Sequence, residues 1–169
     1  MPEQETLRRA KKDKEEGKAP TTQAGEFIRE EMEHIREGKH GARSTKQAIA
    51  IGLSKARRAG VKLPPPKKGE ASEKTRQSAE SAYKEGQSSQ HHKTSPKRSR
   101  ATLQALKREG HSAASQGPLS HQAKEQAHQK TAAQRSEIGK KAARTRMAHQ
   151  SHAQRSRIAK KAARTRAGR

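Results

Sequence analysis

The stretch TQAGEFIREEMEHIREGKHGARSTKQAIAIGLSKARRAG (residues 22–60) decides the fold. Its apolar residues recur every three or four positions in two runs, which is the spacing of one buried face on a helix. The pattern predicts two helices, about residues 22–37 and 45–59, joined by residues 38–43 into a helical hairpin. The predicted apolar seam between them consists of Phe27, Ile28, Met32 and Ile35 from the first helix and Ile49, Leu53 and Ala56 from the second.

Local signals mark the ends of these helices. Ser44 and Gln47 match a capping box, in which the serine oxygen and the glutamine amide satisfy backbone donors at a helix start. Gly38 and Gly60 stand where the two helices would end, because glycine readily adopts the left-handed conformation of a helix terminus. Residues 64–66 are three prolines, which cannot continue a helix and form a stiff spacer. We therefore expect the hairpin to close at the proline run.

Outside the hairpin the sequence predicts shorter helical pieces separated by polar links. Helical tendency is found over residues 3–16, 73–85, 100–109 and from about residue 121 onward. The glycine- and serine-containing segments at residues 86–95 and 110–120 are typical of flexible connections.

Composition predicts that little of the chain is packed. The 169 residues include 40 Lys and Arg against 17 Asp and Glu, a net charge of +23, and Phe27 and Tyr83 are the only aromatic residues. High charge with little apolar surface favours disorder, because burial cannot offset the conformational entropy that folding costs. We expect a mostly α fold with extensive disorder, in which a small N-terminal helical hairpin is followed by a flexible, partly helical basic tail. The expected parts are a helical module with a proline-rich end (1–69), a flexible linker with short helices (70–125) and the basic tail (126–169).

Two near-identical blocks close the chain. They are QRSEIGKKAARTR (residues 134–146) and QRSRIAKKAARTR (residues 154–166), and residues 126–169 hold 13 Lys and Arg against the single acid Glu137. On one continuous helix Ile138 and Ile158 would lie about 160° apart, so the blocks cannot share an apolar stripe. The duplication predicts two independent contacts with a polyanion.

The candidate nucleic-acid-binding residues are the cations of the two most basic zones and of a short Ser-Pro-Lys-Arg motif. Residues 38–69 contain nine basic residues and no acid. An alternative is that the acidic stripe at Glu26, Glu30, Glu33 and Glu37 pairs with the basic second helix and screens it. The motif at residues 95–98 is typical of histone tails, where a turn presents two cations to the minor groove. The candidates are Lys46, Lys55, Arg57, Arg58, Lys67, Lys68, Lys97, Arg98, Arg135, Lys140, Lys141, Arg144, Arg146, Arg155, Arg157, Lys160, Lys161, Arg164 and Arg166.

Residues 16–69 resemble a bacterial family of uncharacterised proteins, and the closest part is GKHGARSTKQAIAIGLSKARRAGVKLPPPKKG (residues 38–69). The segment RSRATLQALKREGHSAAS (residues 98–115) and the AARTR words of the tail resemble extended members of the same family. Members often carry the label DNA-binding protein, so the resemblance implies association with nucleic acid and defines no catalytic residue. The basic, alanine-rich tail also resembles the tails of linker histones and of small bacterial stress-repeat proteins.

Neither catalysis nor a metal site is predicted. The chain has no Cys, no glycine-rich phosphate loop and no catalytic motif, and we expect no cofactor. The closest histidine pairs, His91-His92 and His149 with His152, lack supporting Cys or carboxylate ligands. No run approaches the roughly 18 apolar residues of a transmembrane helix, and we expect no membrane partner.

The expected function is that of a nonenzymatic, largely sequence-independent DNA-binding protein of the bacterial nucleoid, in the cytoplasm, which acts by neutralising phosphates. Duplex DNA is the favoured partner, and a homodimer through residues 22–60 is a further expectation. An RNA- or ribosome-associated factor and a disordered stress protectant stay open as alternatives.

Overall fold

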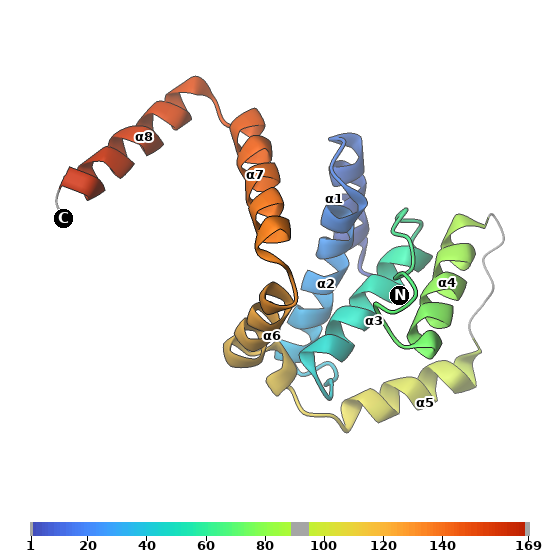
Figure 1. Ribbon diagram of the computed structural model, residues 1–169. Helices are drawn as coiled ribbons and strands as arrows, with labels where there is room; N and C mark the ends of the chain where they lie inside the picture. The colour runs from blue at the N-terminus through green and yellow to red at the C-terminus, as the bar shows by residue number, and fades with distance from the viewer. Residues whose placement is uncertain (1, 89–94, 168–169) are drawn as a thin grey trace. The chain divides into compact units, whose positions relative to one another are not determined.

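The computed structural model describes residues 2–88 and 95–167 (Figure 1). The fold is α-helical, with 75% of the chain in helices. Over the described residues the elements are α1 (Gln4–Glu15), α2 (Pro20–Arg36), α3 (Thr45–Arg58), α4 (Glu73–Gln87), α5 (Pro96–Lys107), the 3-10 turn η1 (Ser112–Ala114), α6 (Gln116–His128), α7 (Ala132–His149) and α8 (His152–Ala167). The prediction of a mostly α protein is confirmed, and the prediction of extensive disorder is wrong.

The chain divides into two compact units, Met1–Gln122 and Ala123–Arg169. The first contains α1 to α5 and the start of α6, and the second contains the rest of α6 with α7 and α8. The assignment of separate roles to residues 1–69, 70–125 and 126–169 stays a prediction.

The predicted hairpin is formed by α2 and α3. Ser44 caps α3 by accepting a hydrogen bond from the Gln47 backbone N–H at 3.2 Å. The Gln47 side chain in turn accepts from the Arg43 N–H at 2.8 Å, one residue earlier than in a regular capping box. Gly38 and Gly60 end the helices with φ of +73° and +87°, as predicted. The following N–H groups of Lys39 and Val61 bond back to the last helical turn, which completes the hydrogen bonding of each terminus.

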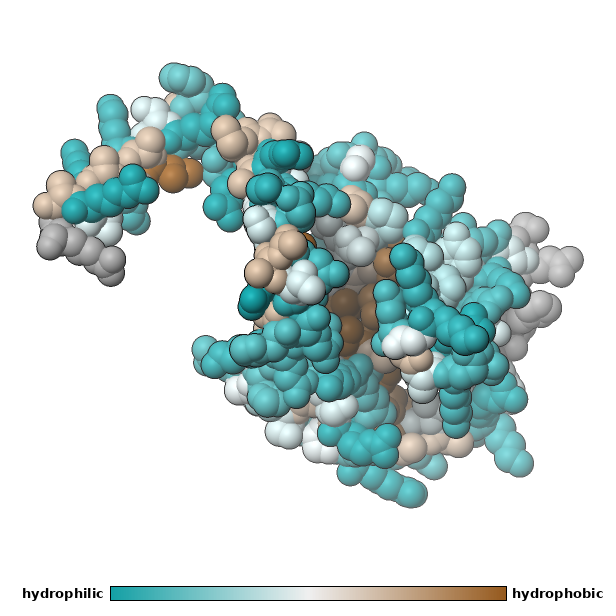
Figure 2. Space-filling view, viewed as in Figure 1, coloured by the Kyte–Doolittle hydropathy of each residue, from teal (hydrophilic) through white to brown (hydrophobic). Residues whose placement is uncertain are grey.

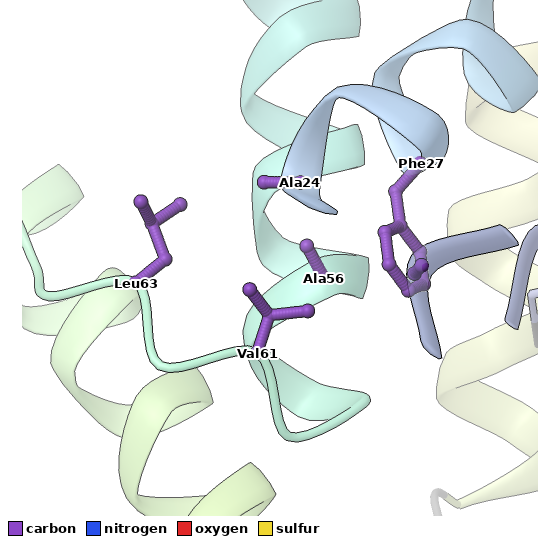
Figure 3. Packing of buried hydrophobic residues seen from close by; sticks show 6 residues of the cluster. Ala24, Phe27, Ala56, Val61 and Leu63 are labelled. Atoms are coloured by element: carbon purple, nitrogen blue, oxygen red, sulfur yellow. The ribbon is translucent and has the colours of Figure 1, made fainter. Parts of the chain in front are cut away.

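The core of the first unit consists of two apolar clusters along the predicted seam. Phe27 and Ala56 lie in the first, with Val61 and Leu63 from the chain after α3 and Ala24 from α2 (Figure 3). Leu7 and Ala10 bring α1 into the same cluster. The seam residue Leu53 packs against this first cluster as well. The second cluster joins four more seam residues to the chain around η1. It contains Met32, Ile35, Ala42, Ala48, Ala113 and Ala114, with Ile28, Ile49 and Leu119 packed against it. The predicted seam is therefore confirmed. Residues of α1 and of the chain after α3 pack against one part of it, and residues around η1 pack against the other.

Small residues let the backbones of the first unit approach closely. A Cβ on Gly52 of α3 would lie 2.8 Å from Ile28 Cα of α2. A Cβ on Gly86 of α4 would collide with the carbonyl of Arg57. Most of the buried apolar residues are alanines, which pack helices at short distances while adding little hydrophobicity to the composition. A count of large apolar residues therefore underestimated how much of the chain is packed.

The segment after α5, predicted as a flexible link, is packed against the hairpin. Backbone N–H groups of Gly41 and Ala42 donate to the carbonyls of Leu106 and Gly110 at 2.9 and 3.0 Å. Two side chains of the hairpin bond to η1: Thr45 Oγ1 donates to the Ala113 carbonyl at 2.7 Å and Arg36 Nε to the Ala114 carbonyl at 3.0 Å. These hydrogen bonds explain why a polar segment with two alanines is held in place.

Candidate nucleic-acid interface

The two repeated blocks form two separate helices, α7 and α8, here called the tail helices. Each begins with the same reciprocal pair of capping hydrogen bonds. The Gln134 N–H donates to Thr131 Oγ1 at 3.2 Å while Gln134 Oε1 accepts from the Thr131 N–H at 3.0 Å. Ser151 and Gln154 repeat this exchange at 3.3 and 2.9 Å. The repeat is therefore a self-capped helix, and two independent contacts with a polyanion stay a prediction.

The cations of the tail helices are exposed and lie on all sides. Those of the two blocks are Arg135, Lys140, Lys141, Arg144, Arg146, Arg155, Arg157, Lys160, Lys161, Arg164 and Arg166. Hydrophilic side chains dominate their visible surface (Figure 2). The single acid of the blocks, Glu137, lies 2.9 Å from Lys140. The large apolar side chains Ile138, Met147 and Ile158 are 50%, 58% and 52% exposed, so neither helix has a buried face.

The basic residues of α3, by contrast, are largely occupied in holding the fold. Lys55 Nζ lies 2.7 Å from Glu31 Oε2 and 3.4 Å from Glu30 Oε1 on α2. Of the predicted acidic stripe, Glu30 takes part in pairing with Lys55, whereas the closer partner, Glu31, lies outside the stripe. Arg58, half-exposed, pairs with Glu85 of α4 at 3.1 Å.

Arg57 is 7% exposed and serves the chain that follows α3. Its Nε donates to the Leu63 carbonyl and its Nη2 to the Pro64 carbonyl, both at 3.2 Å. Burial lowers the pKa of the Arg57 guanidinium from its usual value, although arginine keeps its charge in proteins. These contacts give Arg57 a structural role.

The other predicted cations of the first unit are exposed. Lys46 lies in the first turn of α3, and Lys67 and Lys68 follow the proline run. Lys97 and Arg98 lie in the first turn of α5, which begins at Pro96. The Ser-Pro-Lys-Arg motif is therefore a helix start and not an isolated turn, because proline at the first helical position has the φ that a helix requires.

Two features of the structure were missed by the sequence reasoning. The caps Thr131 and Ser151 could have been found from the Ser/Thr-x-x-Gln spacing that precedes both blocks. The second feature is a buried polar cluster between α2 and the chain that follows it, around Glu31. It could not have been found in this way, because its residues come together only after the turn at Gly38. His91 and His92 lie outside the described residues.

Comparison with known proteins locates the family resemblance. Residues 11–68 match a family of unknown function (DUF6496). The match covers the hairpin and the last five residues of α1, whereas the segment 98–115 and the tail lie outside it. No curated protein and no solved structure matches the chain. Among the described helices, none is both long and apolar enough to cross a lipid bilayer.

Proposed function

We propose that the protein is a nonenzymatic, largely sequence-independent DNA-binding protein of the nucleoid, and that α7 and α8 are its DNA-contacting elements. The observation that carries this proposal is the exposure of 11 cations on two self-capped helices whose blocks contain one acid. A polyanion with charge on every side of the contact suits such helices, and duplex DNA carries a phosphate charge about every 1.7 Å along its axis. Phosphate contacts position a protein and carry no sequence information directly.

The tail helices suit backbone contact better than base stacking. Over 16 and 18 residues they extend about 24 and 27 Å, a length that reaches several phosphates. Neither contains an aromatic residue, and stacking on aromatic rings is the main source of single-strand affinity. Because α7 and α8 already begin with caps in the free chain, part of the entropy of ordering them is met before DNA binds.

The two alternative functions, a disordered stress protectant and an RNA-associated factor, are not equally compatible with the structure. A disordered stress protectant requires extensive disorder, which the helical structure contradicts. Structured RNA presents the same phosphates as DNA, so an RNA- or ribosome-associated factor stays the second candidate. Competition between duplex DNA and structured RNA of equal length for the full-length protein separates the two.

The salt dependence of binding tests the proposal directly. If 8–10 cations contact phosphates, affinity for a random-sequence duplex should fall about 10³–10⁵-fold between 50 and 200 mM salt. Fluorescence anisotropy with duplexes of two unrelated sequences measures both the salt slope and the sequence dependence. A salt-independent affinity, or a large preference for one sequence, would contradict phosphate neutralisation as the driving force.

A charge-matched pair of variants locates the contact. Replacing Lys160, Lys161, Arg164 and Arg166 with Gln should reduce the slope of log K against log salt by about 3 to 4. Replacing Lys11, Lys12, Lys14 and Lys74 with Gln removes the same charge from exposed positions of the first unit and should leave the slope unchanged. Equal effects of the two variants would show that net charge alone drives binding.

A further inference from the structure

Three potential metal ligands meet beside the α2–α3 connection. Glu31 and His34 lie one turn apart on α2, and His40 follows the turn at Gly38. Each offers one nitrogen or oxygen atom, and these atoms lie within 4.8 Å of one another. Glu31 is fully buried, His40 is 7% exposed and the His34 side chain is 13% exposed.

The carboxylate at the centre of this cluster lacks the hydrogen bonds that burial demands. Neither oxygen of Glu31 has a hydrogen bond of acceptable geometry, although Lys55 Nζ lies 2.7 Å from Oε2. Glu30 beside it is also 99% buried, and Lys55 pairs with both carboxylates. An uncompensated buried charge is strongly unfavourable, and a cation bound by Glu31 would offset the negative charge that Lys55 leaves unpaired.

The hydrogen bonds of the two histidines leave a lone pair on each ring. His40 Nδ1 lies 3.1 Å from the Gly41 carbonyl, which can only accept, so Nδ1 carries the proton. His34 Nε2 lies 2.8 Å from Glu3 Oε1 and donates to that carboxylate. Metal-binding histidines regularly donate their other N–H to a carbonyl or a carboxylate in this way.

We propose that Glu31, His34 and His40 bind a divalent transition-metal ion of the zinc class. His40 Nε2 and Glu31 Oε1 lie 3.3 Å apart and are not aligned for a hydrogen bond. Two ligands bound at about 2.0–2.1 Å with a tetrahedral angle lie about 3.3 Å apart, and neither points at the other. Imidazole with one carboxylate suits zinc and its neighbours, whereas calcium and magnesium prefer oxygen ligands.

The role of the ion would be structural. It would join the C-terminal part of α2 to the connection that leads into α3, close to the hydrogen bonds of Gly41 and Ala42 with residues 106 and 110. Glu3 and the Gly41 carbonyl would orient the two imidazoles. The inference is independent of DNA binding, because none of these residues belongs to the tail helices.

Metal titration of the full-length protein, first stripped with a chelator, tests the inference. At Zn²⁺ concentrations near 100 times Kd, the Tm of the first unit should rise by about 5–10 °C, and Mg²⁺ or Ca²⁺ should leave it unchanged. Co²⁺ should give the visible absorption of a four-coordinate site. No shift with Zn²⁺, or an equal shift with Mg²⁺, would overturn the inference.

A matched pair of double variants distinguishes this site from histidines elsewhere in the chain. His34→Gln/His40→Gln should weaken Zn²⁺ binding more than about 100-fold, whereas His149→Gln/His152→Gln removes two tail histidines and should keep the Tm shift. Equal binding by both variants would contradict the site. Should the first variant fail to fold, histidine NMR of the wild type decides: selective Zn²⁺-induced shifts of His34 and His40 support the site. A His40 ring that stays protonated on both nitrogens in excess Zn²⁺ overturns it.

Discussion

Arg57 and Arg58 are neighbours on α3 with the same side chain and different surroundings. The guanidinium of Arg57 is buried and bonds to the carbonyls of Leu63 and Pro64. That of Arg58 is exposed and meets only Glu85 among the contacts described above. In sequence the two residues are equivalent members of a basic patch. Their separate roles depend on which side of α3 the following chain crosses.

This difference predicts unequal effects of the same substitution. Arg57→Ala should destabilise the first unit by about 2–4 kcal/mol, because it removes the donors of the Leu63 and Pro64 carbonyls and the packing of the side-chain stem. Arg58→Ala should cost less than about 1 kcal/mol, the usual worth of an exposed ion pair. Urea unfolding monitored by Tyr83 fluorescence measures both.

The same two variants also test the role of α3 in binding. DNA affinity of Arg57→Ala, measured below its unfolding transition, should change no more than that of Arg58→Ala. Similar losses of stability in both variants would contradict the structural role given to Arg57. A loss of DNA affinity confined to Arg57→Ala would show that this side chain reaches phosphate.

At the scale of the elements, the ends of the two hairpin helices could be predicted from the sequence. The cap at Ser44 and the terminators Gly38 and Gly60 are local signals, and the structure places all three as predicted. The apolar seam was equally accessible, since helical periodicity alone aligns Phe27 and Ile35 on one face.

Contacts between distant elements could not be predicted in this way. The sequence predicts a flexible connection from residue 86 onward, yet α4 continues through Gly86, where a glycine is required because α4 meets the Arg57 carbonyl. Ala113 gives no apolar signal, and its packing depends on a hydrogen bond to Thr45, 68 residues away. The cluster of Glu31 and His40 likewise forms only because the turn at Gly38 brings the following chain back against α2.

At the scale of the elements, the caps of the tail helices predict a measurable loss of helix. Thr131→Ala and Ser151→Ala together should weaken each helix by about 1 kcal/mol, because each removes an acceptor from the first turn. Far-UV circular dichroism at low salt should show reduced helicity, and the salt slope of DNA binding should stay the same because no cation is removed.

A control within the same helices is available. Thr145 and Thr165 bond through their hydroxyls to carbonyls four residues earlier, in the helix interior. Thr145→Ala/Thr165→Ala should preserve or raise helicity, since alanine has the higher helix propensity. A drop in helicity equal to that of the cap variant would contradict the capping interpretation.

At the scale of the whole molecule, the stability of the first unit is expected to depend on acid pH. Among the described residues, five carboxyl groups of the first unit have a lowered pKa. A hydrogen bond from His34 lowers the pKa of Glu3 to about 2, and hydrogen bonds from nearby basic side chains lower the pKa of Glu5, Glu16, Glu73 and Glu80. Phe27 and Tyr83 also lie in this unit, so near-UV signals report on it alone.

A lowered pKa in the folded state makes stability fall in acid. The contribution of these groups is complete above the unfolded pKa of about 4.3 and is lost as pH decreases toward their folded values. The near-UV Tm of the full-length protein should therefore fall between pH 5 and pH 2.

The contribution of α4 to this loss can be isolated. The pKa of Glu73 is lowered chiefly by a hydrogen bond from Arg76 and that of Glu80 by one from Lys84. Glu73→Gln/Glu80→Gln should have a lower Tm than the wild type at pH 7, and the two curves should converge near pH 2. A constant difference at every pH would show that these ionisations are not linked to folding.

The self-contained cap of each tail helix has a consequence for how this protein can change in length. Twenty residues separate Thr131 from Ser151, and each such stretch brings its own start signal, one helix and five or six cations. Twenty-residue copies can thus be gained or lost without changing the capping of the neighbouring helices. Because linked contacts multiply rather than add their binding constants, the number of copies would set how long the protein stays on its polymer.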